Sequence, residues 1–472
     1  VVTHVFMIGY GILTHIPVVT TVAGDIQSGF HHGLTSLGGW GMMLLFLHAY
    51  SLGGGTYTGI EAVSNGLQIM REPKVQTGKR TMVYLASSLA ITAGGIFICY
   101  LLLGVHHVEG QTLNAVLAGN LFNHWGFGRE LAFITIFSEG ALLFVAAQAG
   151  FIDGPRVMAN MAIDSWFPHR FAALSNRLTM RNGVVMMGVA ALFPLIYTHG
   201  AISKLIVMYS INVFLTFSIS QLGMSTFFIK KRKKDREWKK HLSVHLVGLA
   251  LCVIILIITT IEKFGEGGWV TILITSVLIG ACYAIKTHYT SVKEEIGKLD
   301  RLMTHIPTTG TMNRASVNPQ EMTAIQLVSG FSGFGVHTFL SIVRNFPHVY
   351  KNFIFVSVAV IDSGTFKGAE EIKNLDESIR DSLKKYVELA RKLGFPAESR
   401  YETGTDVVEI ATRVCKQITN EFPRSTVFTG QLTFRLEKSY HKLLHNETAF
   451  AIQRHLQWEG VTTVILPIRV EA

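Results

Sequence analysis

The feature that most constrains the fold is a series of long apolar segments separated by short clusters of basic residues. Only 16% of the 472 residues are charged, which is low for a soluble protein of this length. An apolar stretch of about 20 residues is long enough to cross a bilayer as a helix. The sequence therefore predicts an α-helical membrane protein, with spans near residues 1–22, 40–70, 82–105, 131–151, 184–197, 202–229, 242–260 and 270–285.

The basic clusters fall between alternate spans. The strongest is Lys230 to Lys234, and others lie in residues 71–80 and 153–182. Because basic loops stay on the cytoplasmic side, we expect a multi-pass protein of the plasma membrane with these segments inside and a turn at residues 266–268 outside. Residues 24–39 and 106–128 are expected as outer loops. The net charge of +10 belongs to these clusters and does not indicate nucleic acid as a partner.

The second apolar segment contains a stretch that is unsuited to a regular helix. It reads Gly53, Gly54, Gly55, Thr56, Tyr57, Thr58, Gly59, Ile60 and Glu61. Glycines weaken a helix interior, and a broken membrane helix persists only where it is buried in protein or lines a polar cavity. An intramembrane acid such as Glu61 marks an ion or substrate path in many proteins. We interpret the stretch as a transport site; the alternative is a close-packed glycine seam with a neutral, hydrogen-bonded Glu61.

This break could bind either of two ligands. The carbonyl groups from Gly54 to Thr58 and the hydroxyls of Thr56, Tyr57 and Thr58 could replace the hydration shell of a small cation. The N–H groups that start the second half-helix could instead face the carboxylate of an amino acid. Glu61 fits both, since it could balance a cation or take up and release a proton. We expect no metal beyond a transported cation.

Other polar residues in the spans admit two interpretations each. Glu139, with Ser138 beside it and Gln148 further on, is either a second functional acid or a tie between helices. Tyr209, with Ser210 and Asn212, either closes the transport site or links helices. The paired histidines and the separated cysteines indicate neither a metal site nor a disulfide framework. Since no catalytic constellation stands out, we do not expect an enzyme.

The C-terminal part of the chain is soluble in character. We expect a membrane domain over residues 1–289, a polar linker over 290–321 and an α/β domain over 322–472. Short strand-like runs alternate with helical patterns, of which residues 370–393 are the clearest, and this alternation predicts a parallel, Rossmann-like sheet. The strands are expected at residues 324–328, 353–361, 397–400, 426–429 and 461–466.

Three glycines, Gly330, Gly333 and Gly335, fall between the first expected strand and the following helix. Such a turn can hold a phosphate group at the helix N-terminus, so these residues are candidates for binding a regulatory nucleotide. The spacing is not that of the G-x-G-x-x-G motif. The alternative is a glycine turn that only allows strand and helix to pack.

The motifs together resemble a known family. Residues 56–65 with Arg71, Glu72 and Pro73 are similar to the discontinuous sixth helix and exit loop of the amino acid/polyamine/organocation (APC) superfamily. Residues 154–159 and 164–168 are similar to its loop after the eighth helix. The resemblance covers roughly residues 1–289 and implies a LeuT-like fold of inverted five-helix repeats with substrate held where two helices break. The chain starts near the fifth helix, so N-terminal helices are expected to be missing.

Within the superfamily, residues 58–62 together with a C-terminal α/β domain resemble the KUP group of potassium importers, of the KimA type. This resemblance implies proton-coupled potassium uptake, with Thr58, Glu61 and Tyr209 lining the ion path. It also implies a homodimer, a cytosolic regulatory domain similar to universal stress proteins and, in some members, inhibition by cyclic di-AMP. No resident cofactor is implied. A proton-coupled amino acid permease is the alternative, and a transporter-like sensor is a third hypothesis.

Overall fold

The fold is described from a computed structural model of the chain, for residues 2–53, 60–67, 70–234, 236–302, 312–364, 369–434, 444 and 447–470. The chain divides into two compact units. The first, which we call the membrane unit, comprises Val1–Asp153 and Gly188–Leu278. The second, which we call the sheet unit, comprises Gly154–Met187 and Ile279–Ala472.

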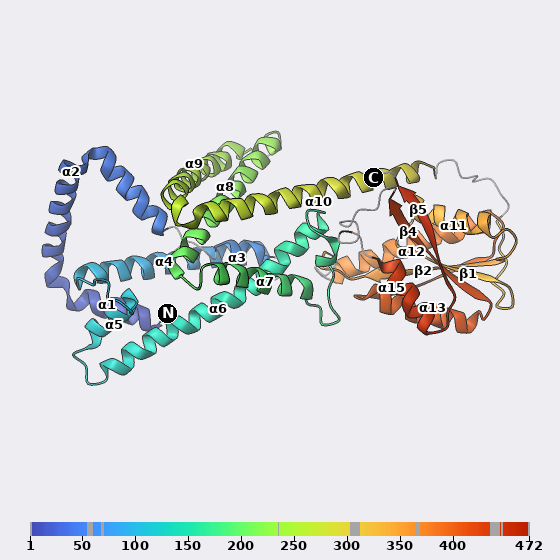
Figure 1. Cartoon of the computed structure of the whole chain (residues 1–472), viewed down its shortest axis with the longest axis horizontal. Helices are drawn as coiled ribbons and strands as arrows, with labels where there is room; N and C mark the ends of the chain where they lie inside the picture. The colour runs from blue at the N-terminus through green and yellow to red at the C-terminus, as the bar shows by residue number, and fades with distance from the viewer. Residues whose placement is uncertain are drawn as a thin grey trace. The chain divides into compact units, whose positions relative to one another are not determined.

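Helices are the regular secondary structure of the described part of the membrane unit, and three of them, α6, α7 and α10, have residues in both units. Figure 1 shows the elements in the colours of their chain order. The predicted spans from residue 82 to residue 285 are confirmed as helical. The elements in chain order are α1 (Val2–Thr14), η1 (Ile16–Val18), α2 (Val19–Gly53), α3 (Ile60–Asn65), α4 (Lys74–Leu102), α5 (Leu113–Phe122), α6 (Gly128–Ile163), α7 (Arg181–Tyr197), α8 (Ile202–Lys231), α9 (Trp238–Lys263), η5 (Phe264–Gly268) and α10 (Trp269–Leu302).

Several of these helices are long and apolar enough to cross a membrane. The described residues contain four such helices, or five if the pair Val2–Thr14 and Ile16–Tyr50, bent by 60°, counts as one span. The fourth of them, Trp238–Asp300, runs through α9, η5 and α10. Gly267 in η5 has φ +108°, a conformation that favours glycine, and the chain changes direction there as expected (Figure 1). The chain is therefore a membrane protein.

One expected outer loop was wrong, and the other contains a short helix. Residues 24–39 are helical and belong to α2, which bends at Gly38, where φ is +70°. The low helix propensities of glycine and histidine are only weak evidence against a helix. The hydroxyl of Ser36 donates to the carbonyl of His32, four residues earlier, at 2.9 Å, and the helix continues past it. Within residues 106–128, the short helix α5 forms because Thr112 caps it by accepting a bond from the Ala115 amide at 3.2 Å.

The first helices of the membrane unit share a small apolar core. Close packing of α1 against α4 depends on Gly95, because a Cβ there would lie 2.5 Å from a methyl carbon of Ile8. Small residues of this kind let membrane helices approach closely. The buried members of the core are Met7, Ile8, Cys99, Leu117, Ala118, Leu121 and Phe122.

The sheet unit contains a parallel five-stranded sheet in the order β3-β2-β1-β4-β5. The predicted strands are confirmed, and so is the predicted helix at residues 370–393. The bounds are β1 (Thr323–Leu327), α11 (Gly333–Asn345), β2 (Asn352–Val360), α12 (Ala369–Lys392), β3 (Ala397–Gly404), α13 (Val407–Glu421), β4 (Ser425–Phe434), α15 (Thr448–Trp458) and β5 (Thr463–Val470).

Helices cover both faces of this sheet. Successive side chains of a strand point to opposite faces, so Phe353 and Phe355 pack with α11 and α12, whereas Ile354 and Val356 pack with α13 and α15. These strands are apolar on both faces, as buried parallel strands are. At one end of the strand order, β5 carries Pro467, which is paired with Gln431 of β4.

The segment 154–187 packs on the sheet within the same unit. Ala173 forms an antiparallel bridge with Asp362, and the Ser363 amide donates to the Ala172 carbonyl at 3.0 Å. Helix α10 continues to Leu302, so the first part of the expected linker, residues 290–302, is helical. The expected domain boundaries at residues 289 and 322 remain predictions.

Candidate functional site

The expected transport site falls at the junction of α2 and α3. Helix α2 ends at Gly53, and α3 begins at Ile60. Gly54, Thr56, Tyr57 and Thr58 lie outside the described residues, as does the side chain of Glu61, whose backbone belongs to α3. Their role as ion ligands therefore stays a prediction.

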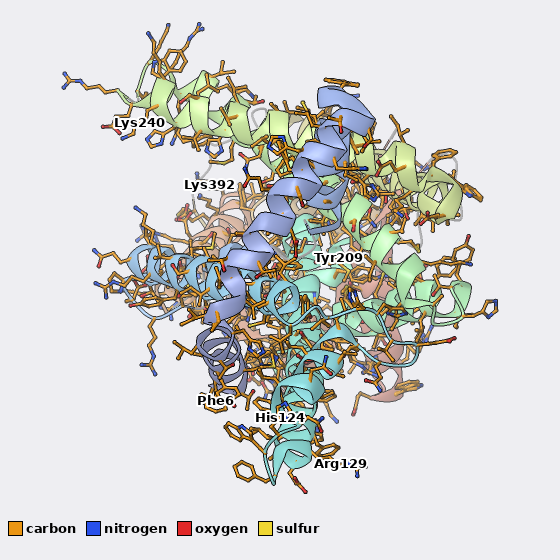
Figure 2. The ribbon with its side chains drawn as sticks, turned by 90° about the vertical axis from the view of Figure 1, so that its left-hand side faces the viewer. Phe6, His124, Arg129, Tyr209, Lys240 and Lys392 are labelled. Atoms are coloured by element: carbon orange, nitrogen blue, oxygen red, sulfur yellow. The ribbon has the colours of Figure 1, made fainter. Side chains whose placement is uncertain are left out.

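Tyr209, the remaining residue of that predicted site, lies on α8 with 41% of its surface exposed (Figure 2). Its neighbour Ser210 is buried and donates to the Ile206 carbonyl of the same helix at 2.8 Å. Asn212 accepts a bond from the Thr275 hydroxyl at 2.9 Å and so links α8 to α10. Asn212 thus has a linking role, one of the two roles that the sequence left open.

A contact between two titratable side chains near the end of α2 was not predicted. His48, near the end of α2, is paired through Nδ1 with the carboxylate of Glu262 near the end of α9. Both side chains are about one-third exposed, at 35% and 36%. The available signal was weak, because Glu262 sits beside Lys263 at the end of a span, where a solvated acid is ordinary.

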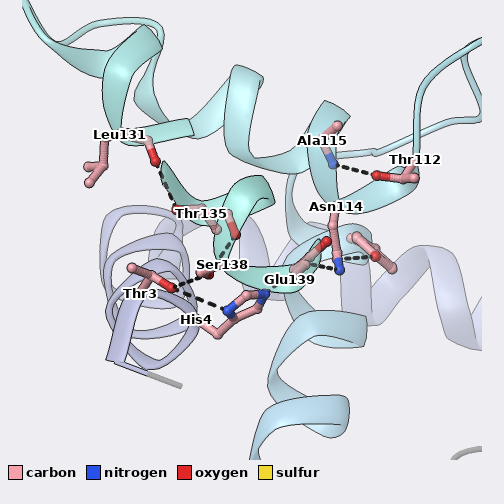
Figure 3. A network of polar contacts seen from close by, with 10 residues as sticks. Thr3, His4, Thr112, Asn114, Ala115, Leu131, Thr135, Ser138 and Glu139 are labelled. Atoms are coloured by element: carbon pink, nitrogen blue, oxygen red, sulfur yellow. Dashed lines mark hydrogen bonds and ion pairs between the residues drawn. The ribbon is translucent and has the colours of Figure 1, made fainter. Parts of the chain in front are cut away.

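Glu139 is the centre of a polar network in the membrane unit (Figure 3). Its Oε1 atom lies 2.7 Å from Nε2 of His4 and 2.6 Å from Nδ2 of Asn114. Tyr100 donates to the Asn114 side-chain oxygen at 2.5 Å. The sequence singled out Glu139 and its neighbour Ser138 but missed His4 and Asn114, which lie in an apolar helix and an expected loop.

The glycine turn of the sheet unit lies where the sequence placed it, between β1 and α11. It borders a cavity of about 380 Å³ at the carboxyl ends of β1, β2 and β4, where ligands bind in open α/β sheets. Polar lining comes from Ser329, Ser332, Thr429, Gln431 and Thr448. The position therefore suits a ligand, and the nucleotide hypothesis stays a prediction.

Several groups at this turn already have partners inside the chain. The Gly333 amide donates to the Asp300 carboxylate of α10 at 2.6 Å, and the Gly335 amide donates to the Ser332 hydroxyl at 3.4 Å. A Cβ at Gly333 would lie 2.4 Å from the carbonyl carbon of Leu299. A Cβ at Gly335 would lie 1.9 Å from the hydroxyl of Tyr386, whose pKa is raised by burial. A phosphate at this helix end would have to replace the Asp300 carboxylate, and the glycines also serve packing.

A second cavity of the sheet unit measures about 970 Å³ and lies between residues 169–182 and the carboxyl end of the sheet. Arg177 and Arg181 line it together with Asp362 and Asp406. His169 at its edge stacks on Tyr289, with ring centroids 4.1 Å apart, and burial lowers its pKa. The sequence placed these basic residues in one loop but gave no sign that they face the sheet.

Comparison with known proteins supports the interpretation of the chain as a membrane transporter. No family model matches the chain. The chain is similar to the potassium transporter KimA of Bacillus subtilis (strain 168), with 25% identity over 462 residues, which cover 97% of the chain and 69% of that protein. That relative is a transporter and not an enzyme, which confirms the expectation of a non-enzymatic function.

Proposed function

We propose that the chain belongs to a secondary active transporter that takes up potassium together with protons across the plasma membrane. The observation that carries this proposal is the similarity to a potassium transporter along almost the whole chain, through both the membrane helices and the sheet unit. The apolar helices supply the membrane region that such an activity needs. An amino acid permease is not favoured, because the similar protein is a potassium transporter.

The ion site of this proposal is the junction between α2 and α3. Gly54, Thr56, Tyr57 and Thr58 would supply oxygen ligands, and Glu61 would balance the ion's charge. Tyr209 of α8 would close the site. In this proposal the helices belong to an inverted-repeat fold of the APC superfamily, in which rocking of one repeat against the other exposes the site to each side in turn.

The sheet domain in this proposal is cytoplasmic. Lys230 and Lys231 end α8, and Lys240, near the start of α9, extends away from the ribbon (Figure 2). Basic clusters of this kind stay inside. The segment with Arg177 and Arg181 lies in the same compact unit as the sheet, which supports placing both on one side of the membrane.

A regulatory role of the sheet domain completes the proposal. The cavity beside Gly330, Gly333 and Gly335 would accept a nucleotide such as cyclic di-AMP, provided that the Asp300 carboxylate moves away from the Gly333 amide. The protein would act as a homodimer, with lipid as its other partner. Neither nucleic acid nor a resident cofactor takes part.

The test is flux into liposomes that carry the full-length protein under an inward proton gradient. Rubidium, as a tracer for potassium, is compared with a mixture of amino acids. We expect rubidium uptake that is lost in Glu61→Gln and reduced in Thr58→Ala. Glu130→Gln makes the same chemical change at an exposed position of α6 and should transport normally. Amino acid uptake without a response to rubidium would contradict the proposal, and binding without flux would indicate a sensor.

A further inference from the structure

The network around Glu139 places two titratable side chains in contact within the membrane unit. We propose that His4 and Glu139 form a proton-binding site, and that this pair takes up and releases the proton that accompanies the cation. The inference rests on the proposed proton-coupled transport and assigns the proton to residues outside the predicted ion site at the α2–α3 junction.

The depth of Glu139 sets the energetic constraint. It lies about 16 Å along the axis of α6 from Gly128, at a rise of about 1.5 Å per residue. This position lies within the apolar span expected over residues 131–151, which is long enough to cross the hydrocarbon core of about 30 Å. Ionisable groups at such a depth are costly and are rarely found without a functional reason.

The contacts of Glu139 are suited to a carboxylate. Oε1 receives the side-chain amide of Asn114 at 2.6 Å and lies 2.7 Å from Nε2 of His4, and short bonds of this kind are typical of an ionised acceptor. The side chains of His4 and Glu139 are only 14% and 22% exposed. Tyr100 fixes the Asn114 amide by donating to its oxygen, so that the NH₂ group faces the carboxylate.

The net charge of the pair depends on a single proton. A neutral imidazole beside a carboxylate carries one negative charge, and the addition of a proton to either group removes that charge. Because an uncompensated charge is far more costly than a paired one in a medium of low dielectric constant, the pair gains from binding the proton. A carboxylate alone or an imidazole alone would have no adjacent titratable group to share the proton or to pair with its charge.

The surroundings of His4 tolerate both protonation states. Its Nδ1 atom lies 3.4 Å from the Thr3 hydroxyl, which in turn lies 3.3 Å from the hydroxyl of Ser138. A hydroxyl group can donate to a bare ring nitrogen or accept from a protonated one. Ser138 can also donate to the carbonyl of Thr135 at 2.7 Å. When Thr3 accepts from a protonated His4, its own hydroxyl can therefore donate to Ser138, and Ser138 still has an acceptor. His4 can therefore gain or lose its proton while its ring nitrogen and the two hydroxyl groups keep their hydrogen bonds.

The network joins four helices, which links proton binding to their movement (Figure 3). Its titratable groups are His4 of α1, Tyr100 of α4 and Glu139 of α6, and α5 contributes the neutral Asn114. A shift of α1 relative to α6 would separate His4 from Glu139 and change the affinity of the pair for its proton. Transport that moves these helices would thereby bind and release a proton in each cycle.

The test separates a proton site from a simple tie between helices. Glu139→Gln keeps an oxygen that accepts from both His4 and Asn114 but cannot ionise, and His4→Gln keeps a donor but cannot become charged. For each full-length variant in liposomes, rubidium exchange at equal concentrations is compared with net uptake driven by a proton gradient, while a pH-sensitive dye follows proton entry. Exchange needs a folded transporter but no net proton movement.

We expect both variants to keep exchange and to lose proton-driven uptake, proton entry and the dependence of transport on external pH. Glu130→Gln should behave as the wild type in every assay. Coupling that survives in both variants overturns the proton site and leaves the proposed function intact. Loss of exchange in both variants overturns it in favour of a structural tie. A wild type that takes up no rubidium contradicts the proposed function, and the proton site with it.

Discussion

The membrane unit and the sheet unit use the same apolar side chains in opposite ways. In the sheet unit Phe353 and Phe355 are 1% and 0% exposed, whereas Leu143 and Phe144 of α6 are 71% and 67% exposed. Apolar residues in water are driven inward, but lipid is as apolar as leucine and gives no such drive. Hydrophobicity therefore determines the packing of the sheet, but only the length and position of the membrane helices.

What holds the membrane helices together must then be local and specific. Close contact at Gly95, the network of Glu139 and the link from Asn212 to Thr275 are contacts of this kind. Each involves a small or polar side chain between helices, as in other membrane bundles. The comparison predicts that truncating an apolar side chain destabilises one unit and hardly affects the other.

The largest effect is expected from Phe355→Ala. This ring is fully buried between β2 and the helices α11 and α12, so its loss should lower the free energy of unfolding of the sheet unit by about 3–5 kcal/mol. The change is measured by unfolding the full-length protein in denaturant and using the proteolytic susceptibility of the sheet unit to report the unfolded fraction. The matched control is Leu143→Ala on α6, for which we expect less than about 0.5 kcal/mol. Equal effects of the two substitutions would contradict the comparison.

A smaller loss is expected from Gly333→Ala, which tests packing that depends on backbone contact. The new Cβ would lie 2.4 Å from the backbone of Leu299, so α10 or the glycine turn must move, at a cost of about 1–3 kcal/mol. Faster hydrogen exchange at the end of α10 would report the movement. Gly330→Ala in the same turn meets nothing within 4 Å and should leave exchange unchanged. Unchanged exchange in Gly333→Ala would show that the contact is dispensable.

Removal of one hydroxyl tests the polar contacts of the membrane unit. Tyr100→Phe loses the bond to Asn114, and we expect a destabilisation of about 0.6 kcal/mol, the average for hydrogen bonds between membrane helices. Thermal unfolding in detergent measures it. Tyr84→Phe on the same helix serves as the control, because that side chain is 72% exposed. Equal melting temperatures for the two variants would count against a stabilising network.

The smallest effect is a dependence on pH near His169. Burial lowers the pKa of this imidazole, so the neutral form is favoured when the segment is packed against Tyr289. The stabilisation is fully present above the unfolded value of about 6.5 and is lost as the pH falls through the lower folded value. The protection factors of residues 169–182, which correct hydrogen exchange for the pH dependence of the intrinsic amide rate, should therefore be lower at about pH 5.5 than at about pH 7.5. In His169→Gln this difference should disappear; if it persists, another group is responsible.

The two units also differ in how far their structures follow from the sequence. The strands were predictable because short apolar runs alternate with a strongly periodic helix such as α12. The helical character of the apolar segments from residue 82 onward was predictable from their length and composition. The helical course of residues 24–39 was not, because glycine and histidine suggested a loop while the backbone bends only at Gly38.

The candidate sites were predictable only in part. Glu139 is conspicuous as an acid in an apolar helix, but its partners His4 and Asn114 come from distant segments and carry no local pattern. Likewise, the glycine spacing indicated a turn at Gly333, whereas the bond from its amide to Asp300 depends on where α10 ends. Side chains that meet across helices are set by packing, which a single sequence does not display.

The proline in the outermost strand β5 has a consequence for association. A strand at the end of a sheet offers unpaired N–H and C=O groups, which can template pairing with another chain. Proline has no N–H to donate, so Pro467 interrupts the row of donors in the middle of β5. Two copies of the sheet are thereby discouraged from joining edge to edge through β5 into an extended aggregate.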